Sequence, residues 1–437
     1  MPPNKKTPKK TKTVTPEEED PAEFNLMDRE DFTTSLMAGL EKSYARKKRA
    51  PLMFDQSKII RDDLPLDSLY FQWAIDNRGI EKKTLIELLG QDQTGKSSLL
   101  YWMAGNWMPL QVPMTLLAGE DKFIKESWAQ RCLSKDPELA AKMVKLITVI
   151  RIRVLDEIDF VVKETLKQMR DPNSKSFVPR HIPVVIAIDL MNKIATANQA
   201  AGMETGYGDY SKDTQSDLGD RGHNWDRAKA YHDLINRFNL QMADQNVVFV
   251  VTTHQNDEAV GGKSNPFSPV WQKNLSHRTK TGGQATNQTT ALQMVVSSHG
   301  NIYCDKEVIA KRVALKPFKN SYGGDRRTCN FAIVPGEDAN ADPKPGLRWD
   351  LTTVEWFAEK GFYGMKRLAS SPATAPLYSC EDFGLRGSNI LEAAKAINDL
   401  PKSDWEELGR NLKIPGYVTP IEDAVKEITK IEENKEL

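Results

Sequence analysis

Residues 85–103 read LIELLGQDQTGKSSLLYWM, which is an apolar run, a short loop bounded by glycines and a second apolar run. The loop, residues 90–98, satisfies G-x-x-x-x-G-K-[ST] and stands in the required context, after a predicted strand and before a predicted helix. Gly90 and Gly95 let successive N–H groups point inward at phosphate oxygens, and the following helix adds its N-terminal dipole. The stretch therefore predicts a nucleotide site.

The cofactors expected at this site are a nucleoside triphosphate and Mg²⁺. Lys96 would neutralise the β- and γ-phosphates, and the Ser97 hydroxyl would reach the metal. The alternative is a chance glycine turn, which the number of matching positions and their context speak against. The residues expected to bind the nucleotide are Gly90, Gln91, Asp92, Gln93, Thr94, Gly95, Lys96, Ser97 and Ser98.

Two carboxylates at the ends of predicted strands fit the chemistry of hydrolysis. One carboxylate must orient or deprotonate the attacking water, and another must hold the metal through its waters. Glu120 ends PMTLLAGE and Asp189 ends PVVIAID, so both stand at carboxyl strand ends beside the expected phosphate. The alternatives are a helix-start acid for Glu120 and a turn residue for Asp189. Their shared position favours the catalytic interpretation.

From about residue 84 to 335, short apolar runs alternate with longer amphipathic ones, which is typical of strands and crossover helices. The apolar runs are too continuous for half-exposed strands, so we expect both of their faces to be covered. The predicted strands are TLIELLG (84–90), PMTLLAGE (113–120), KLITVIRIRVL (145–155), IPVVIAIDL (182–190) and NVVFVVTTH (246–254); the predicted helices include SSLLYWMAGNW, ELAAKMVKL and WDRAKAYHDLINRFNLQMA. The pattern predicts an α/β fold with a mostly parallel central sheet flanked by helices.

The ends of the chain differ from this core in composition. The first stretch is rich in Pro, Lys and Glu and nearly free of apolar side chains, so we expect it to be disordered. The next stretch places Leu36, Leu40 and Tyr44 on one helical face, ahead of the basic run YARKKR. After a Pro-rich linker, helical patterns predict a small α-rich C-terminal domain with a charged tail. The predicted divisions are a tail at 1–22, a helical segment at 23–59, the core at 60–338 and the C-terminal domain at 339–437.

Charge and cysteine content narrow the class of protein. Lys+Arg and Asp+Glu both number 60 in the 437 residues, so net charge indicates neither an acidic nor a basic partner. No apolar run approaches the ~18–20 residues of a membrane span, and the N-terminus lacks the apolar region of a signal peptide. The four cysteines have no C-x-x-C spacing, which argues against a zinc site or a disulfide framework. We therefore expect a soluble, cytoplasmic protein with no membrane partner.

Two long polar segments interrupt the rhythm of strands and helices. Residues 195–224 and 256–284 are glycine-rich, and both exceed the usual loop length inside a compact domain. Each follows an apolar strand that carries a polar residue at its carboxyl end, where open parallel sheets place their ligand sites. We expect such segments to be functional or mobile.

Several features follow one another along the chain in a fixed order. They are the phosphate loop, Glu120, Asp189, a strand ending in Thr-His-Gln at Gln255, and a segment closing on Thr-Gly-Gly at 281–283. This order resembles that of the RecA-type strand-exchange recombinases, especially phage-encoded ones. LKPFKNS (315–321), followed by NFAIV, is similar to the Lys-Asn motif and closing strand of that family. The resemblance covers about residues 60 to 335.

The resemblance implies a RecA-like, DNA-dependent ATPase that forms filaments on single-stranded DNA and promotes strand exchange in recombination and repair, in a bacterial or phage-infected cell. Glu120 would be the general base, and Asp189 would support Mg²⁺. Gln255 would sense the γ-phosphate, so that ATP and DNA binding share one two-state element. Lys319 would reach the ATP of the neighbouring subunit and act in trans as arginine fingers do. The N-terminal helix would dock on the next subunit, with packing on its own domain as the alternative.

The two long segments would then be DNA-binding loops for single- and double-stranded DNA. The second interleaves cations for phosphates with aromatic rings that stack on bases, whereas the first also carries several acids. The alternative for both is a solvated surface excursion. The residues expected to bind DNA are Lys263, Phe267, Trp271, Lys273, Arg278, Lys280, Gly282 and Gly283 in the second segment and Tyr207 and Arg221 in the first.

Two other functions are compatible with the same motifs. One is a hexameric DNA helicase or loader, although such proteins usually carry an arginine finger and a separate N-terminal domain. The other is an ATP-switched DNA-binding filament with little turnover. The sequence also departs from the family at Ser321, where a second lysine is common, so Lys316 is a candidate substitute. Leu190 likewise stands where a small hydroxyl residue is common.

Overall fold

The computed structural model describes residues 35–36, 63–119, 125–189, 191, 194, 217–254, 289–322, 327–338, 341–368 and 376–414, without the side chains of 217–228. The predicted tail 1–22 and all of the predicted segment 23–59 except residues 35–36 lie outside these ranges. Leu36, from that segment, is fully buried and belongs to the main hydrophobic core of its own chain.

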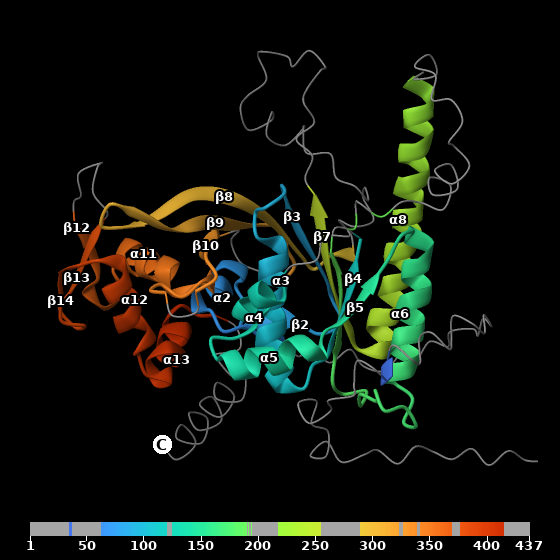
Figure 1. The fold of residues 1–437 in the computed structure, drawn as a ribbon, viewed down its shortest axis with the longest axis horizontal. Helices are drawn as coiled ribbons and strands as arrows, with labels where there is room; N and C mark the ends of the chain where they lie inside the picture. Colours follow the sequence, from blue (N-terminus) through green and yellow to red (C-terminus); the bar gives the residue numbers. More distant parts are fainter. Residues whose placement is uncertain are drawn as a thin grey trace, which may run out of the picture.

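A nine-stranded sheet forms the centre of the fold, in the order β11-β10-β9-β8-β3-β7-β6-β4-β5 (Figure 1). The neighbours from β8 to β5 in this order pair parallel, and β9, β10 and β11 continue the sheet by antiparallel pairing. The predicted α/β fold, a mostly parallel central sheet flanked by helices, is confirmed. The strands are β3 (Leu85–Gly90), β4 (Met114–Ala118), β5 (Thr148–Arg151), β6 (Val184–Asp189), β7 (Val247–His254), β8 (Leu292–Cys304), β9 (Glu307–Asn320), β10 (Cys329–Val334) and β11 (Gly346–Arg348).

Strands β3, β4, β6 and β7 form where apolar runs are buried on both faces. Every residue of β3 and β4 is buried, as is every residue of β6 and β7 except the last. These last residues are Asp189 and His254, which stand at the carboxyl edge of the sheet. The pattern explains why the continuous apolar runs of the sequence are strands covered by helices rather than half-exposed strands.

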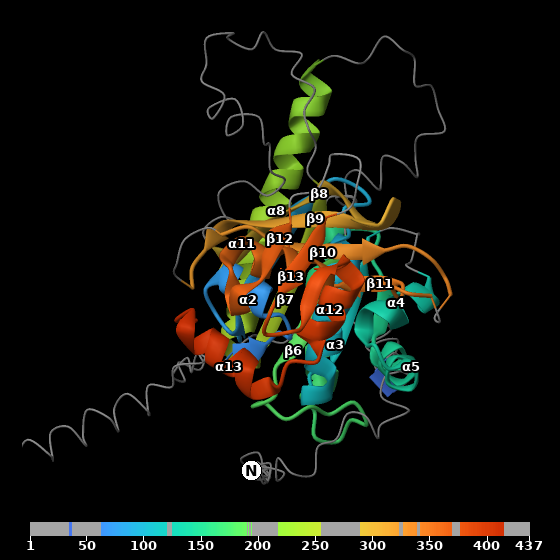
Figure 2. The same ribbon diagram turned by 90° about the vertical axis from the view of Figure 1, so that its left-hand side faces the viewer.

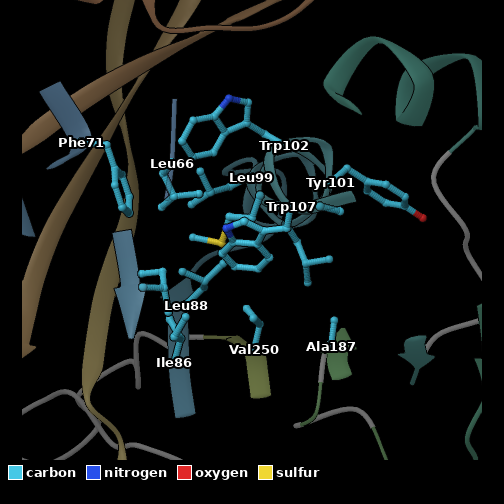
Figure 3. Close-up of a cluster of buried hydrophobic side chains, with 14 of the residues drawn as sticks. Leu66, Phe71, Ile86, Leu88, Leu99, Tyr101, Trp102, Trp107, Ala187 and Val250 are labelled. Carbon is cyan, nitrogen blue, oxygen red and sulfur yellow. The ribbon is translucent and has the colours of Figure 1, made fainter. Parts of the chain in front are cut away.

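Helices cover both faces of the parallel strands. Ile86 of β3 and Val250 of β7 face Trp107 of α3 (Lys96–Trp107) (Figure 3). The neighbouring Phe249 stacks instead on Phe238 of α8, with 4.0 Å between ring centroids. Because successive residues of a strand point to opposite faces, α3 and α8 lie on opposite sides of the sheet. The α3 side continues with α4 (Glu126–Leu133) and α5 (Pro137–Leu146), and α6 (Leu155–Met169) packs beside α8 (Figure 1).

Helix α8 (Asp217–Gln245) begins earlier than the sequence predicts. Residues 217–224, which we expected in a long polar segment, belong to this helix, so Arg221 stands on a helix and not in a loop. Once the amphipathic part from 225 onward is anchored, each added residue extends the helix without a new nucleus. With 29 residues at ~1.5 Å each, α8 is ~44 Å long, against ~26 Å for the eight residues of β7. Its first turns therefore project beyond the carboxyl edge of the sheet (Figures 1 and 2).

The region after residue 338 differs from the predicted α-rich domain. Strand β11 belongs to the central sheet, and Trp349 packs with Phe71 and Trp102 in the same core. The Pro-rich stretch thus does not mark a boundary, because the chain returns to the sheet directly after it. The elements that follow are α11 (Asp350–Lys360), η6 (Phe362–Gly364), α12 (Ile390–Asn398), α13 (Lys402–Asn411) and a three-stranded antiparallel sheet of β12 (Lys366–Leu368), β13 (Leu377–Cys380) and β14 (Leu385–Ser388).

Further short elements stand before and after the phosphate loop. The antiparallel pair β1 (Asp63–Pro65) and β2 (Gly79–Glu81) encloses α2 (Leu69–Ile75), and η3 (Met108–Leu110) follows α3. The Trp107 indole nitrogen donates to the Pro65 carbonyl at 3.1 Å, which ties α3 to β1. Among the helices of the described residues, none combines the length and apolar character that crossing a bilayer takes.

Candidate nucleotide site

The loop between β3 and α3 is held by the strands beside it. β3 ends at Gly90 and α3 begins at Lys96, with Gly95 before it in the left-handed region (φ 91°). A Cβ on Gly95 would lie 2.5 Å from Ile333 Cδ1, and a Cβ on Gly90 would lie 2.2 Å from the Val296 carbonyl oxygen. Glycine is therefore required at Gly90 by the close approach of the β8 backbone and at Gly95 by its positive φ.

Lys96 lies folded over the loop. It is only 5 % exposed, and its Nζ donates to the carbonyls of Gly90 at 2.8 Å and Gln91 at 2.5 Å. Gly95, the N-cap residue of α3, makes no side-chain hydrogen bond to the helix start, which is the arrangement that suits an anion at a helix N-terminus. A buried ammonium group beside such a helix start fits a nucleotide phosphate.

Ser97 and Asp189, predicted together as the metal pair, come together in the structure. The Ser97 hydroxyl donates to Asp189 Oδ2 at 2.7 Å, and the Thr252 hydroxyl donates to Asp189 Oδ1 at 2.6 Å. Three different elements, α3, β6 and β7, thus fix one carboxylate. A hydroxyl and a carboxylate are oxygen ligands of the kind that Mg²⁺ takes. Sequence reasoning missed Thr252, although a hydroxyl near the end of the predicted strand 246–254 was the available signal.

Two side chains beside this pair were also missed. The Trp128 indole nitrogen donates to the Ser98 hydroxyl at 2.9 Å and so ties α4 to the first turn of α3. Burial raises the pKa of the Tyr101 hydroxyl to about 12, and the negative charge of Asp189 adds to that rise. Tyr101 therefore stays protonated at neutral pH and neighbours Asp189 as a neutral group.

His254 links the end of β7 to the loop. Its Nε2 lies 3.2 Å from Asp92 Oδ2, and its Nδ1 lies 3.3 Å from the Gly90 carbonyl oxygen. The same carbonyl accepts from Lys96. Gly90 is therefore the point where the loop, α3 and the end of β7 meet.

Lys319, the lysine expected to work on ATP in trans, stands apart from the loop of its own chain in the strand register. Lys319 pairs with Gln293 of β8, which in turn pairs with Glu87 of β3, three positions before Gly90. This register sets Lys319 about 10 Å back along the strands and about 10 Å to the side. The backbone of Lys319 thus lies away from the phosphate loop of its own chain, and its contact with a neighbouring subunit stays a prediction. Lys311, farther along the same strand, reaches the loop instead and donates to the Gln93 carbonyl at 3.2 Å.

Several predicted site residues lie outside the described part of the chain. They are Glu120, Gln255, Tyr207, Lys263, Phe267, Trp271, Lys273, Arg278, Lys280, Gly282 and Gly283. The backbone of Arg221 is described, as part of α8, and its side chain is not. The roles of all these residues stay predictions.

No protein-family model matches the sequence, and no curated protein matches it.

Proposed function

We propose that this chain is an ATP-dependent DNA recombinase of the RecA type, which forms filaments on single-stranded DNA and catalyses homologous pairing and strand exchange. The observation that supports it most is the hydrogen bond of 2.7 Å between Ser97 and Asp189, beside a buried Lys96. A phosphate-loop hydroxyl on the carboxylate of a neighbouring strand end is the arrangement in which P-loop NTPases hold Mg²⁺. The role in DNA metabolism rests on the order of motifs in the sequence.

The proposed reaction uses few groups of the chain. Lys96 would turn its ammonium from the loop carbonyls to the phosphates, and Ser97, oriented by Asp189, would face the metal. Mg²⁺ would supply charge neutralisation between the phosphates. Glu120 would take a proton from the water whose oxygen bonds to the γ-phosphorus as the bond to the bridging oxygen breaks and ADP leaves.

The geometry of the sheet supports a link between ATP and DNA. β6 and β7 are adjacent and parallel, and β7 also pairs with β3. β6 and β7 therefore end at the same edge of the sheet as β3, which the phosphate loop follows, and the segments that come after β6 and β7 in the chain start there. Because these segments contain the predicted DNA-binding residues, ATP binding at the phosphate loop would change the affinity for DNA, and DNA binding would change the affinity for ATP.

The test measures ATP hydrolysis with and without single-stranded DNA, with electron microscopy of the same mixtures. Stimulation by DNA together with helical filaments supports the proposal. Closed rings would favour a helicase or loader, and filaments without turnover would favour an ATP-switched binding protein. For a strand-exchange ATPase, Glu120→Gln should abolish hydrolysis, keep ATP binding and give longer-lived filaments on DNA. Unchanged ATP hydrolysis in Glu120→Gln would show that Glu120 is not the general base.

A further inference from the structure

Glu87 is an acidic residue in the middle of an otherwise apolar strand. It belongs to β3, three positions before Gly90, and is 1 % exposed. Its Oε1 accepts a hydrogen bond from the Thr253 hydroxyl at 3.1 Å, and its Oε2 accepts one from Gln293 Nε2 at 3.1 Å. Both donors are themselves buried. Burying a carboxyl group is unfavourable unless it is hydrogen-bonded, whereas an apolar side chain here would fit the rest of LIELLG.

The two donors come from the strands on either side of β3. Thr253 belongs to β7 and Gln293 to β8, and these strands pair with β3 and not with each other. They are also the strands that stand directly before and after residues 255–288 in the chain. Glu87 therefore joins, through one carboxyl group, both ends of the segment that contains the predicted sensor and the second predicted DNA-binding loop.

Glu87 points away from α3. Ile86 and Leu88, on either side of it, face α3 (Figure 3), so Glu87 lies on the opposite face of β3. Register partners share a face, so Gln293 and its partner Lys319 on β9 lie on this face too. A row of polar residues thus crosses β3, β8 and β9 and ends at the lysine expected to act in trans.

We propose that Glu87 is a positioning residue that couples occupancy of the phosphate loop to the positions of β7 and β8, the strands on either side of residues 255–288 in the chain. This role rests on the proposed function, in which ATP binding and DNA binding affect one another. Lys96 donates to the Gly90 carbonyl in this structure. When that ammonium turns to a phosphate, the Gly90 carbonyl keeps His254 as a neighbour and loses a donor. The end of β3 then shifts, and the two hydrogen bonds of Glu87 pass the shift to β7 and β8 together.

The variant that tests this role is Glu87→Met. Methionine matches the length of the side chain and removes both hydrogen bonds at once. Glu87→Gln is the conservative partner, because its carbonyl can accept from Gln293 while its amide donates to the Thr253 hydroxyl, which accepts as well as donates. Asp159→Leu is the matched control. Asp159 is a buried carboxylate that accepts from Lys163, Arg237 and Gln241 between α6 and α8, away from the loop.

The first measurement is the affinity for ATP with and without saturating single-stranded DNA. In the wild type we expect the ratio of the two to lie in the usual range of allosteric coupling, roughly 5- to 150-fold. In Glu87→Met it should fall to within about twofold of one, with ATP affinity in the absence of DNA little changed. Glu87→Gln and Asp159→Leu should keep the wild-type ratio. A purely structural Glu87 would instead lower thermal stability as Asp159→Leu does and leave the ratio unchanged.

The second measurement is amide hydrogen exchange at residues 247–254 and 290–296, with and without ATP and in the absence of DNA. ATP should change exchange at both strands in the wild type and at neither in Glu87→Met. If Glu87→Met does not fold, Gln293→Met, which removes one bond and keeps the carboxyl group, should lose the change at 290–296 alone. A folded variant with the wild-type ratio and exchange overturns this inference alone. If the ATP affinity of the wild type is the same with and without DNA, both the proposed function and this inference are overturned.

Discussion

The two ends of the parallel strands hold their polar groups in opposite ways. At the carboxyl end, the Asp189 carboxylate is held by two hydroxyls of other elements, those of Ser97 and Thr252. At the amino end, the Arg170 guanidinium, which follows the last turn of α6, donates to main-chain oxygens of described residues. These acceptors are the carbonyls of Val178, Pro179, Ile182 and Gln245, at 2.7–3.1 Å.

The hydrogen-bond partners of Asp189 can be exchanged for a ligand, whereas those of Arg170 cannot. Hydroxyls and the Lys96 ammonium rotate about side-chain bonds, so a ligand can replace their present partners at the carboxyl end. The carbonyls around Arg170 are fixed by the backbone just before β6 and β7, so the guanidinium closes the amino end of the sheet. Burial lowers the pKa of Arg170 to about 9, with the charge of Arg180 adding to it, and the group therefore stays protonated at neutral pH. We assign function to the first end and stability to the second.

Of the changes at either end of the sheet, Lys96→Ala should have the largest effect, a loss of ATP turnover at the carboxyl end. The ammonium group is the cation nearest the expected phosphates, and the loss of such a group costs on the order of 100- to 1,000-fold in turnover. Thermal stability should change little, because the two loop carbonyls that Lys96 now contacts are reached by water once the side chain is shortened. Turnover is measured by phosphate release and stability by calorimetry. Lys142→Ala, an exposed lysine on α5, is the control. Unchanged turnover in Lys96→Ala would remove the ATPase assignment.

Arg170→Met should destabilise the fold at the amino end of the sheet and leave ATP binding at the carboxyl end unchanged. Methionine keeps the length of the side chain but leaves four carbonyls without this donor, so we expect a loss of about 3 kcal/mol in the free energy of unfolding. Urea denaturation measures the loss. ATP affinity, measured at a urea concentration where both proteins are folded, should stay within about twofold if the two ends are independent. Arg180→Met, an exposed neighbour, is the control. A parallel loss of ATP affinity would show that the two ends are coupled.

The sequence predicted the elements with strong local signals and missed those that depend on tertiary contacts. The strands from β3 to β7 follow from apolar runs, and the phosphate loop follows from its glycines. The hairpin of β8 and β9 was not predicted as such, because its exposed half, such as Tyr303 and Val308, lacks a buried alternation. The start of α8 was missed because Gly219 and Gly222 make its first turns look like a loop.

The candidate site shows the same division. Lys96, Ser97 and Asp189 were predicted from motif and strand position, and the structure brings the last two into contact. Glu87 and His254 were not singled out, because one acid in an apolar run and one histidine before Gln255 carry no spacing signal. Their partners, Thr253 and Asp92, are distant in sequence and are brought close only by the pairing of β3 with β7.

Thr252→Val tests how much the Asp189 carboxylate at the carboxyl end depends on the Thr252 hydroxyl. The change removes the hydroxyl that orients Asp189 and keeps the size of the side chain, so we expect turnover to fall about 10-fold, as for other groups that orient metal ligands. The Mg²⁺ concentration for half-maximal activity should rise as well. Thr115→Val is a matched control, because Thr115 is a fully buried strand threonine whose hydroxyl has no hydrogen-bond partner among the residues that the structure describes. Equal turnover in the two variants would mean that Asp189 needs no support from β7.

Asp350→Asn tests a third buried charge, where β11 meets α11, and should have the smallest effect. Burial by itself raises the pKa of Asp350, but the hydrogen bonds and charge of Arg348, with a hydrogen bond from Asn398, outweigh it and hold the pKa below its usual range. A depressed carboxyl pKa contributes stability that is present above the unfolded pKa and lost as pH falls through the folded one. Asp350→Asn should therefore lower stability at pH 7 by about 1 kcal/mol and flatten its decline below about pH 4. Urea denaturation across pH measures both, with the exposed Asp382→Asn as control. A pH slope of stability that Asp350→Asn leaves unchanged would show that Arg348 does not depress the pKa of this carboxyl group.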